Sequence, residues 1–144
     1  MADLELTRRY AASPEKVFEA ISQPQALLQW WGPEGLRVEP DNLDFTRLGP
    51  WGSVMINPEG ARYKVTGQVT HVDPPRSVGF TWAWHDDDDQ RGPESHVTFT
   101  VEPDGSGGTL FRLSHVDLAD DDAVANHNTG WSSSLTKLDA LFAT

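Results

Sequence analysis

A run of short strand-like segments separated by turn residues occupies the middle of the chain, from residue 36 to residue 116. Proline, glycine, asparagine and aspartate gather between the segments, at residues 49–50, 57–60, 73–75 and 103–105. These links have the length of hairpins and leave no room for crossover helices. The pattern therefore predicts an antiparallel sheet and argues against parallel βαβ units.

Alternating hydrophobicity places the strands within this run. We predict them over residues 51–57, 61–72, 77–84, 96–102 and 109–116, with a further strand inside residues 36–45. Another strand is expected at the start of the chain, over residues 3–11. There Leu4 and Leu6 alternate with Asp3 and Glu5, which is typical of a half-buried strand.

Helical signals flank the strand region on both sides. Ser13, Pro14 and Glu15 form a helix start, because serine caps free N–H groups and proline suits the first helical position. A second short helix is expected over residues 24–30. A long helix over residues 121–143 is predicted from Trp131, Leu135, Leu138 and Phe142, which fall on one helical face. Asp120 or its neighbours can cap its start.

The order of these elements predicts an α+β fold. One strand and two short helices come first, about six hairpin strands follow, and one long helix ends the chain. The 144 residues suit a single domain spanning residues 1–144. A bent antiparallel sheet can wrap around a long helix, although periodicity does not reveal the curvature or any gap between the two.

Composition excludes several function classes. Eleven basic and 22 acidic residues give a net charge of −11, which disfavours binding to nucleic acid or to anionic membranes. The chain has no cysteine, so disulfides and thiolate metal sites are excluded. No apolar run is long enough to span a bilayer, and the acidic N-terminus does not resemble a signal peptide. A cytoplasmic location is expected.

Four motifs together carry a family resemblance. They are Ser13–Phe18, Gln29–Pro33, Val72–Arg76 followed by Phe80-Thr81-Trp82, and Gly130-Trp131 before Leu135 and Leu138. In this order the chain resembles the Hsp90 ATPase activator homologue-1-like family of the START-like (SRPBCC) superfamily. The resemblance implies the helix-grip fold, in which a curved antiparallel sheet of about seven strands surrounds the long C-terminal helix. It also implies a largely apolar cavity between sheet and helix.

Strand alternation suggests which residues would line such a cavity, because the apolar set of each strand should face the long helix. On this face a tyrosine, a histidine and several indoles supply polar tips that could orient a ligand. The candidate ligand-binding residues are Val54, Ile56, Tyr63, Val65, Phe80, Trp82, Trp84, Val97, Phe99, Leu113, His115, Trp131 and Leu135. A filled core in which Trp82 and Trp131 simply pack together is the competing interpretation.

Histidines offer two further kinds of chemistry, acid–base catalysis and metal binding. An inward His115 would be kept neutral by burial and could act as an acid or base. His85 and His96 flank an acidic loop, but no metal-ligand spacing accompanies them, and no metal or other cofactor is expected.

Three functions therefore stay open. The first is a domain that binds a small hydrophobic or aromatic ligand. The second, implied by the resemblance, is a chaperone-associated interaction module of the Hsp90-activator-like, stress-related type, whose partner would present a basic patch. The third is a cavity enzyme of the cyclase or hydrolase type that uses His115 or Tyr63. A homodimer is also compatible with the sequence.

Overall fold

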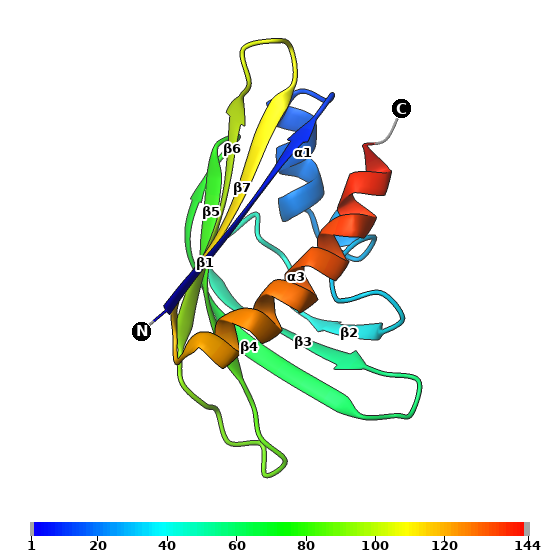
Figure 1. Cartoon of the computed structure of the whole chain (residues 1–144), viewed down its shortest axis with the longest axis vertical. Coiled ribbons are helices and arrows are strands. Elements are labelled where there is room, and N and C mark those ends of the chain that lie inside the picture. Colours follow the sequence, from blue (N-terminus) through cyan, green and yellow to red (C-terminus); the bar gives the residue numbers. More distant parts are fainter. Residues whose placement is uncertain (1, 143–144) are drawn as a thin grey trace.

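Seven strands form one antiparallel sheet in the computed structural model, which describes residues 2–142 (Figure 1). The sheet order is β1-β7-β6-β5-β4-β3-β2, so only the pairing of β1 with β7 joins strands far apart in the sequence. The strands are β1 (Ala2–Tyr10), β2 (Arg37–Asp41), β3 (Gly49–Ile56), β4 (Arg62–Asp73), β5 (Ser77–Trp84), β6 (Ser95–Pro103) and β7 (Thr109–Leu118). The predicted fold class is confirmed.

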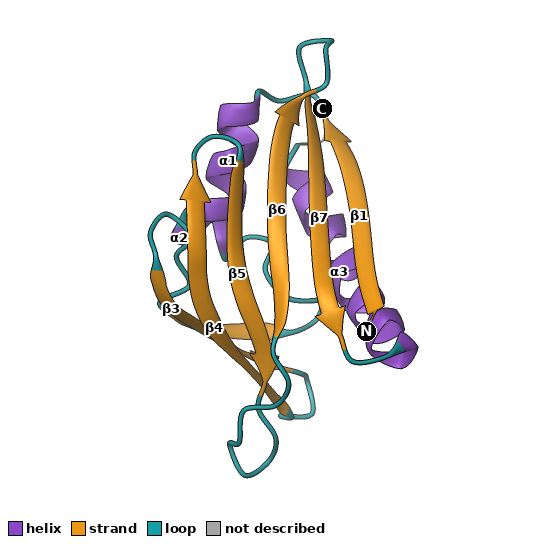
Figure 2. Cartoon of the chain, turned by 90° about the vertical axis from the view of Figure 1, so that its left-hand side faces the viewer, coloured by secondary structure: helices purple, strands orange, loops and turns teal. Residues whose placement is uncertain are grey.

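Three helices lie on the same face of the sheet, as the view of the opposite face shows (Figure 2). They are α1 (Pro14–Ser22), α2 (Pro24–Leu27) and α3 (Asp121–Leu141). The long helix α3 crosses the sheet diagonally on its concave side (Figure 1). Among the described residues, no helix combines the length and the hydropathy that crossing a bilayer requires.

The helix starts follow the capping signals in the sequence. The Ser13 hydroxyl accepts a hydrogen bond from the Lys16 amide at 3.3 Å, and the Asp120 carboxylate accepts one from the Ala123 amide at 2.8 Å. Each cap satisfies an N–H group that has no partner inside the first helical turn.

One predicted helix end is wrong, and another lies outside the described residues. The second helix ends at Leu27 and not at Trp30. The Gln29 and Trp30 amides bond to the carbonyls three residues earlier, so the chain tightens into turns. The predicted end of α3 at residue 143 lies outside the described residues.

The core lies between α3, α1 and the inner face of the sheet. Strand β5 is buried along nearly its whole length, and Phe99, Phe111 and Leu113 are fully buried on the neighbouring strands. Helix α3 contributes Trp131, Leu135 and Leu138, which are buried as their helical spacing predicted. Burial of these apolar side chains is the main force that holds α3 on the sheet.

A tryptophan-lined pocket between α3 and the sheet

A pocket of about 540 Å³ opens between the first half of α3, the segment after α2 and the ends of β3, β4 and β5. The segment after α2 supplies Trp31, Gly32, Pro33 and Leu36. The strands supply Met55, Tyr63, Trp82 and Trp84. The long helix supplies Ala123, Asn126, His127, Gly130, Trp131 and Ser134. The surface that the pocket presents is therefore largely apolar and aromatic.

The tryptophans of the pocket pack against one another around Trp82 and Trp131. The ring centroids of Trp82 and Trp131 are 5.1 Å apart, and Trp84 meets Trp82 edge to face at 5.3 Å. Trp31 meets Trp131 edge to face at 5.7 Å. Such edge-to-face pairs add to the stability gained from burial alone, so this wall is held in a defined shape.

His115 joins α3 to the sheet from behind this wall. Its Nδ1 accepts a hydrogen bond from the Trp131 indole at 3.1 Å, so its proton lies on Nε2, which is 2.7 Å from the Ser95 hydroxyl oxygen. Burial lowers the pKa of His115 to about 3. The imidazole is completely buried and neutral, with both nitrogens engaged inside the protein.

His127, on α3, lies at the pocket surface, and both of its nitrogens are also engaged inside the protein. Its Nδ1–H donates to the Ala123 carbonyl at 2.7 Å, and its Nε2 accepts from the Trp84 indole at 2.9 Å. Burial lowers the pKa of His127 as well. Its ring lies edge to face against His115, with centroids 4.8 Å apart. The two imidazoles thus form a neutral pair between α3 and the strands.

The sequence pattern that defines the family described as "Activator of Hsp90 ATPase homolog 1-like protein" matches residues 11–143. This chain belongs to that family. The crystal structure of the AHSA1 protein from Silicibacter pomeroyi shares 60% sequence identity over 96% of both chains, with a TM-score of 0.91. Among curated proteins, no match was found.

More distant solved structures share the fold of this Hsp90-ATPase-activator-like chain. A crystal structure from Chromobacterium violaceum has 24% identity and a TM-score of 0.84, covering 99% of this chain and 98% of that one. One from Mycobacterium smegmatis has 25% identity and a TM-score of 0.81, covering 99% and 91%. The family resemblance stated from the motifs is confirmed.

Four of the predicted residues line the pocket of this family member, and most of the others lie deeper. Tyr63, Trp82, Trp84 and Trp131 are at the pocket surface. The ring of Trp131 also lies near that of Phe99, with centroids 6.0 Å apart, and its indole bonds to His115. A second group is almost wholly buried in the core behind the pocket: Val65, Phe80, Val97, Phe99, Leu113, His115 and Leu135.

Val54 and Ile56 do not line the pocket, although Ile56 is buried, and the register of β3 corrects their predicted orientation. Met55 pairs directly with Tyr63 in the register of β3 and β4, and both residues line the pocket. Directly opposed residues share one face of a sheet, so the residues next to Met55 project to the other face. Val54 and Ile56 were predicted as the apolar residues of this strand that face the long helix, but the strand register places Met55 there.

The sequence prediction included Trp131 but none of the other α3 residues that line the pocket. Ala123, His127, Gly130 and Ser134 recur at the helical spacing and border the buried stripe of Trp131, Leu135 and Leu138. Because these four residues are small or polar, the hydrophobic pattern of α3 did not reveal that they share a face. The missed loop residues, Trp31 to Pro33, stand within a motif that carried the family resemblance but gave no orientation.

The two histidines that flank the acidic loop serve different partners. His85 lies 2.9 Å from Asp89 and 2.8 Å from the Thr66 hydroxyl, whereas His96 lies 3.0 Å from Asp117. Each is thus engaged in its own local contact on the sheet. Within residues 2–142, no cluster of three or more histidine or acidic side chains has the arrangement of a metal site.

Proposed function

We propose that this protein binds a small hydrophobic or aromatic molecule in the pocket between α3 and the sheet. The observation that carries the proposal is the pocket itself. Its volume of about 540 Å³ falls in the range typical of small-molecule sites, and tryptophans form much of its wall. Moving apolar ligand surface from water into such a pocket supplies the binding free energy.

Gly130 gives a direct test, because it lies on the pocket side of α3 and leaves space. A Cβ atom at this position would meet only Pro33 Cγ, at 3.9 Å. The larger side chain of Gly130→Leu would therefore project into the pocket without striking the backbone. The same substitution removes a glycine from a helix interior, which favours folding.

The experiment is a fluorescence titration of the pocket tryptophans with a panel of substituted naphthalenes. The expected result is quenching or a spectral shift in the natural protein and its loss in Gly130→Leu. Thr129→Leu is the matched control, because Thr129 is exposed on the same helix and is not a pocket residue. Failure of every compound to change the natural protein's signal would overturn the proposal.

A chaperone partner is the second candidate, and the family description favours it. The net charge of −11 suits a partner surface rich in lysine and arginine. The test is the ATP turnover of a purified Hsp90-type chaperone with and without this protein, at low and high salt. Stimulation that declines with salt supports the partner, and unchanged turnover at low salt counts against it.

A cavity enzyme that works through His115 has less support. The imidazole is fully buried behind Trp131, and both of its nitrogens are already engaged. An acid or base must come within hydrogen-bond reach of the proton it transfers. Tyr63, the other acid–base candidate of this enzyme hypothesis, is exposed to the pocket.

A further inference from the structure

Most side-chain hydrogen-bond donors in the pocket wall already have partners inside the protein. Three indole N–H groups are already used inside the protein: Trp31 donates to Ser53, Trp84 to His127 and Trp131 to His115. These contacts leave the inner wall with little to offer a polar ligand atom, because each indole has a single N–H donor.

The α3 side of the wall follows the same rule. The His127 Nδ1–H donates to the Ala123 carbonyl, and the Ser134 hydroxyl donates to the Gly130 carbonyl at 3.2 Å. The indole N–H of Trp82 has no partner among the described residues, but its nitrogen is hidden from solvent. A ligand atom does not reach that nitrogen while the wall keeps this shape.

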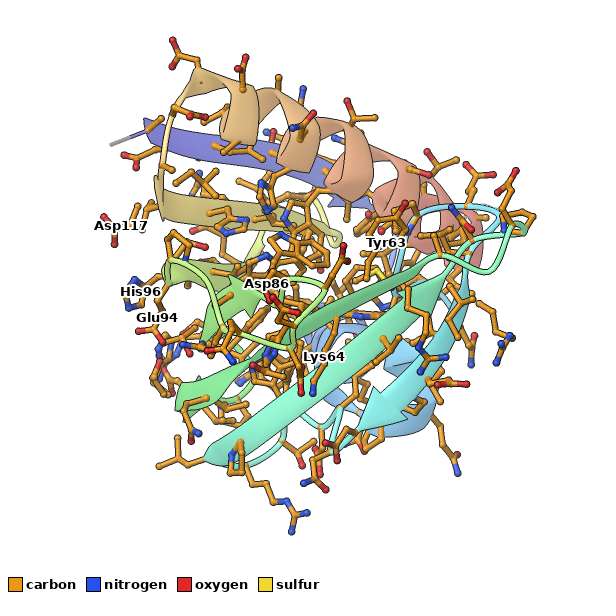
Figure 3. All side chains as sticks on the ribbon, turned by 90° about the horizontal axis from the view of Figure 1, so that it is seen from below. Tyr63, Lys64, Asp86, Glu94, His96 and Asp117 are labelled. Atoms are coloured by element: carbon orange, nitrogen blue, oxygen red, sulfur yellow. The ribbon has the colours of Figure 1, made fainter. Side chains whose placement is uncertain are left out.

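Tyr63 and Asn126 are the pocket residues whose side-chain donors remain accessible. The Tyr63 side chain is about half exposed, and its oxygen is 3.5 Å from the Asn57 amide nitrogen, which donates to it. The phenolic proton of Tyr63 is therefore free to donate. Tyr63 points toward α3 while its neighbour Lys64 points away (Figure 3). Asn126 is exposed on α3 and lines the same pocket.

Charge further restricts the ligand. Of the described residues that line the pocket, none is lysine, arginine, aspartate or glutamate. The chain as a whole carries −11, and both nearby histidines are kept neutral by burial. An anion would meet repulsion and find no cation to pair with. A cation would find aromatic faces but no carboxylate, and burying an unpaired charge is costly.

We infer that the ligand is a neutral aromatic compound with a carbonyl or comparable oxygen acceptor at one end, bound with its ring inside and the oxygen at Tyr63 and Asn126. This inference rests on the proposed function and specifies its ligand class. It assigns Tyr63 as the residue that selects an oxygenated ligand over a hydrocarbon of the same shape.

The test uses a pair of probes that differ in one group. 2-Acetylnaphthalene carries a carbonyl where 2-isopropenylnaphthalene carries a CH₂ group of similar shape. Tyr63→Phe is expected to weaken binding of the ketone about fivefold and to leave the hydrocarbon unchanged, since a neutral hydrogen bond has about that effect. Lys64→Ala, on the opposite side of β4, is the matched control and should change neither affinity.

The outcomes separate this inference from the proposed function. Equal effects of Tyr63→Phe on both probes, or none, would overturn the inference while leaving ligand binding intact. Tighter binding of 2-naphthoate or of a naphthyl trimethylammonium probe than of the ketone would overturn the assignment of a neutral ligand. Absence of binding by all four probes would remove both claims together.

Discussion

The indole N–H of Trp131, on helix α3, donates to Nδ1 of His115, on strand β7, across 3.1 Å. The bond links the C-terminal helix to β7, the strand next to the β1 edge of the sheet, and both side chains are buried. It also fixes the His115 proton on the nitrogen that faces Ser95. Because this contact connects α3 to the sheet at the edge of the pocket, replacing either residue should change the free energy of unfolding.

Replacing Trp131 with alanine should lower the free energy of unfolding by about 3–5 kcal/mol, the usual cost of deleting a large buried aromatic side chain. The loss also leaves His115 Nδ1 without its donor. Urea denaturation measures the effect. Thr136→Ala, at an exposed position of α3, is the control and should stay within about 0.5 kcal/mol of the natural protein. A similar result for both variants would contradict the packing described.

Acid should weaken the fold through His115. Its pKa is about 3 in the folded protein and 6.5 when unperturbed, so between these values the unfolded chain binds a proton that the folded chain does not. The contribution to stability is complete above pH 6.5 and is lost as pH falls towards 3, with a limiting slope of about 1.4 kcal/mol per pH unit. Burial of His127 acts in the same direction.

The measurement is the free energy of unfolding between pH 7 and 5, compared with that of His115→Gln. The variant should show a shallower slope, and the difference between the two slopes isolates His115 from the carboxylates. Identical slopes in His115→Gln and the natural protein would rule out the assigned role.

Two glycines should respond to alanine with opposite signs. Gly130→Ala should stabilise the fold by about 0.5–1 kcal/mol, because glycine is a poor residue in a helix interior and the added methyl group would meet only Pro33 Cγ, at 3.9 Å. Gly67→Ala should destabilise it, because the new Cβ would overlap the Thr81 carbonyl oxygen. Thermal denaturation of both variants compares them, and a shift of both in one direction would be inconsistent with the structure.

A second hydrogen bond, which is partly buried, joins the end of α3 to β1. The Tyr10 hydroxyl donates to Asp139 at 2.7 Å, and the pKa of Tyr10 is raised, first by burial and then by that carboxylate. Tyr10→Phe should cost about 1.5 kcal/mol, the lower end of the range for a hydrogen bond to a charged group, because the Asp139 side chain is partly exposed. Urea denaturation of Tyr10→Phe, Asp139→Asn and the double variant forms a double-mutant cycle that measures the coupling energy between the two residues. A coupling near zero would show that the bond contributes nothing.

Local patterns in the sequence determined the elements of this fold. Alternation predicted β5 with its bounds at Ser77 and Trp84, and the spacing of Trp131, Leu135 and Leu138 predicted the buried face of α3. The caps at Ser13 and Asp120 follow from side-chain chemistry acting within one helical turn. These features depend on neighbours in the sequence, and the sequence by itself therefore suffices for them.

The tertiary structure alone decided which residues meet at the pocket. Strand register, set by pairing between distant residues, placed Met55 opposite Tyr63 and turned Val54 away. The packing of α3 brought Trp131 to His115 and carried that histidine out of the pocket. Such contacts join residues far apart in the chain, and no local period encodes them. The sequence thus specified which residue types form the pocket wall, and tertiary packing specified which of those side chains are exposed to the pocket.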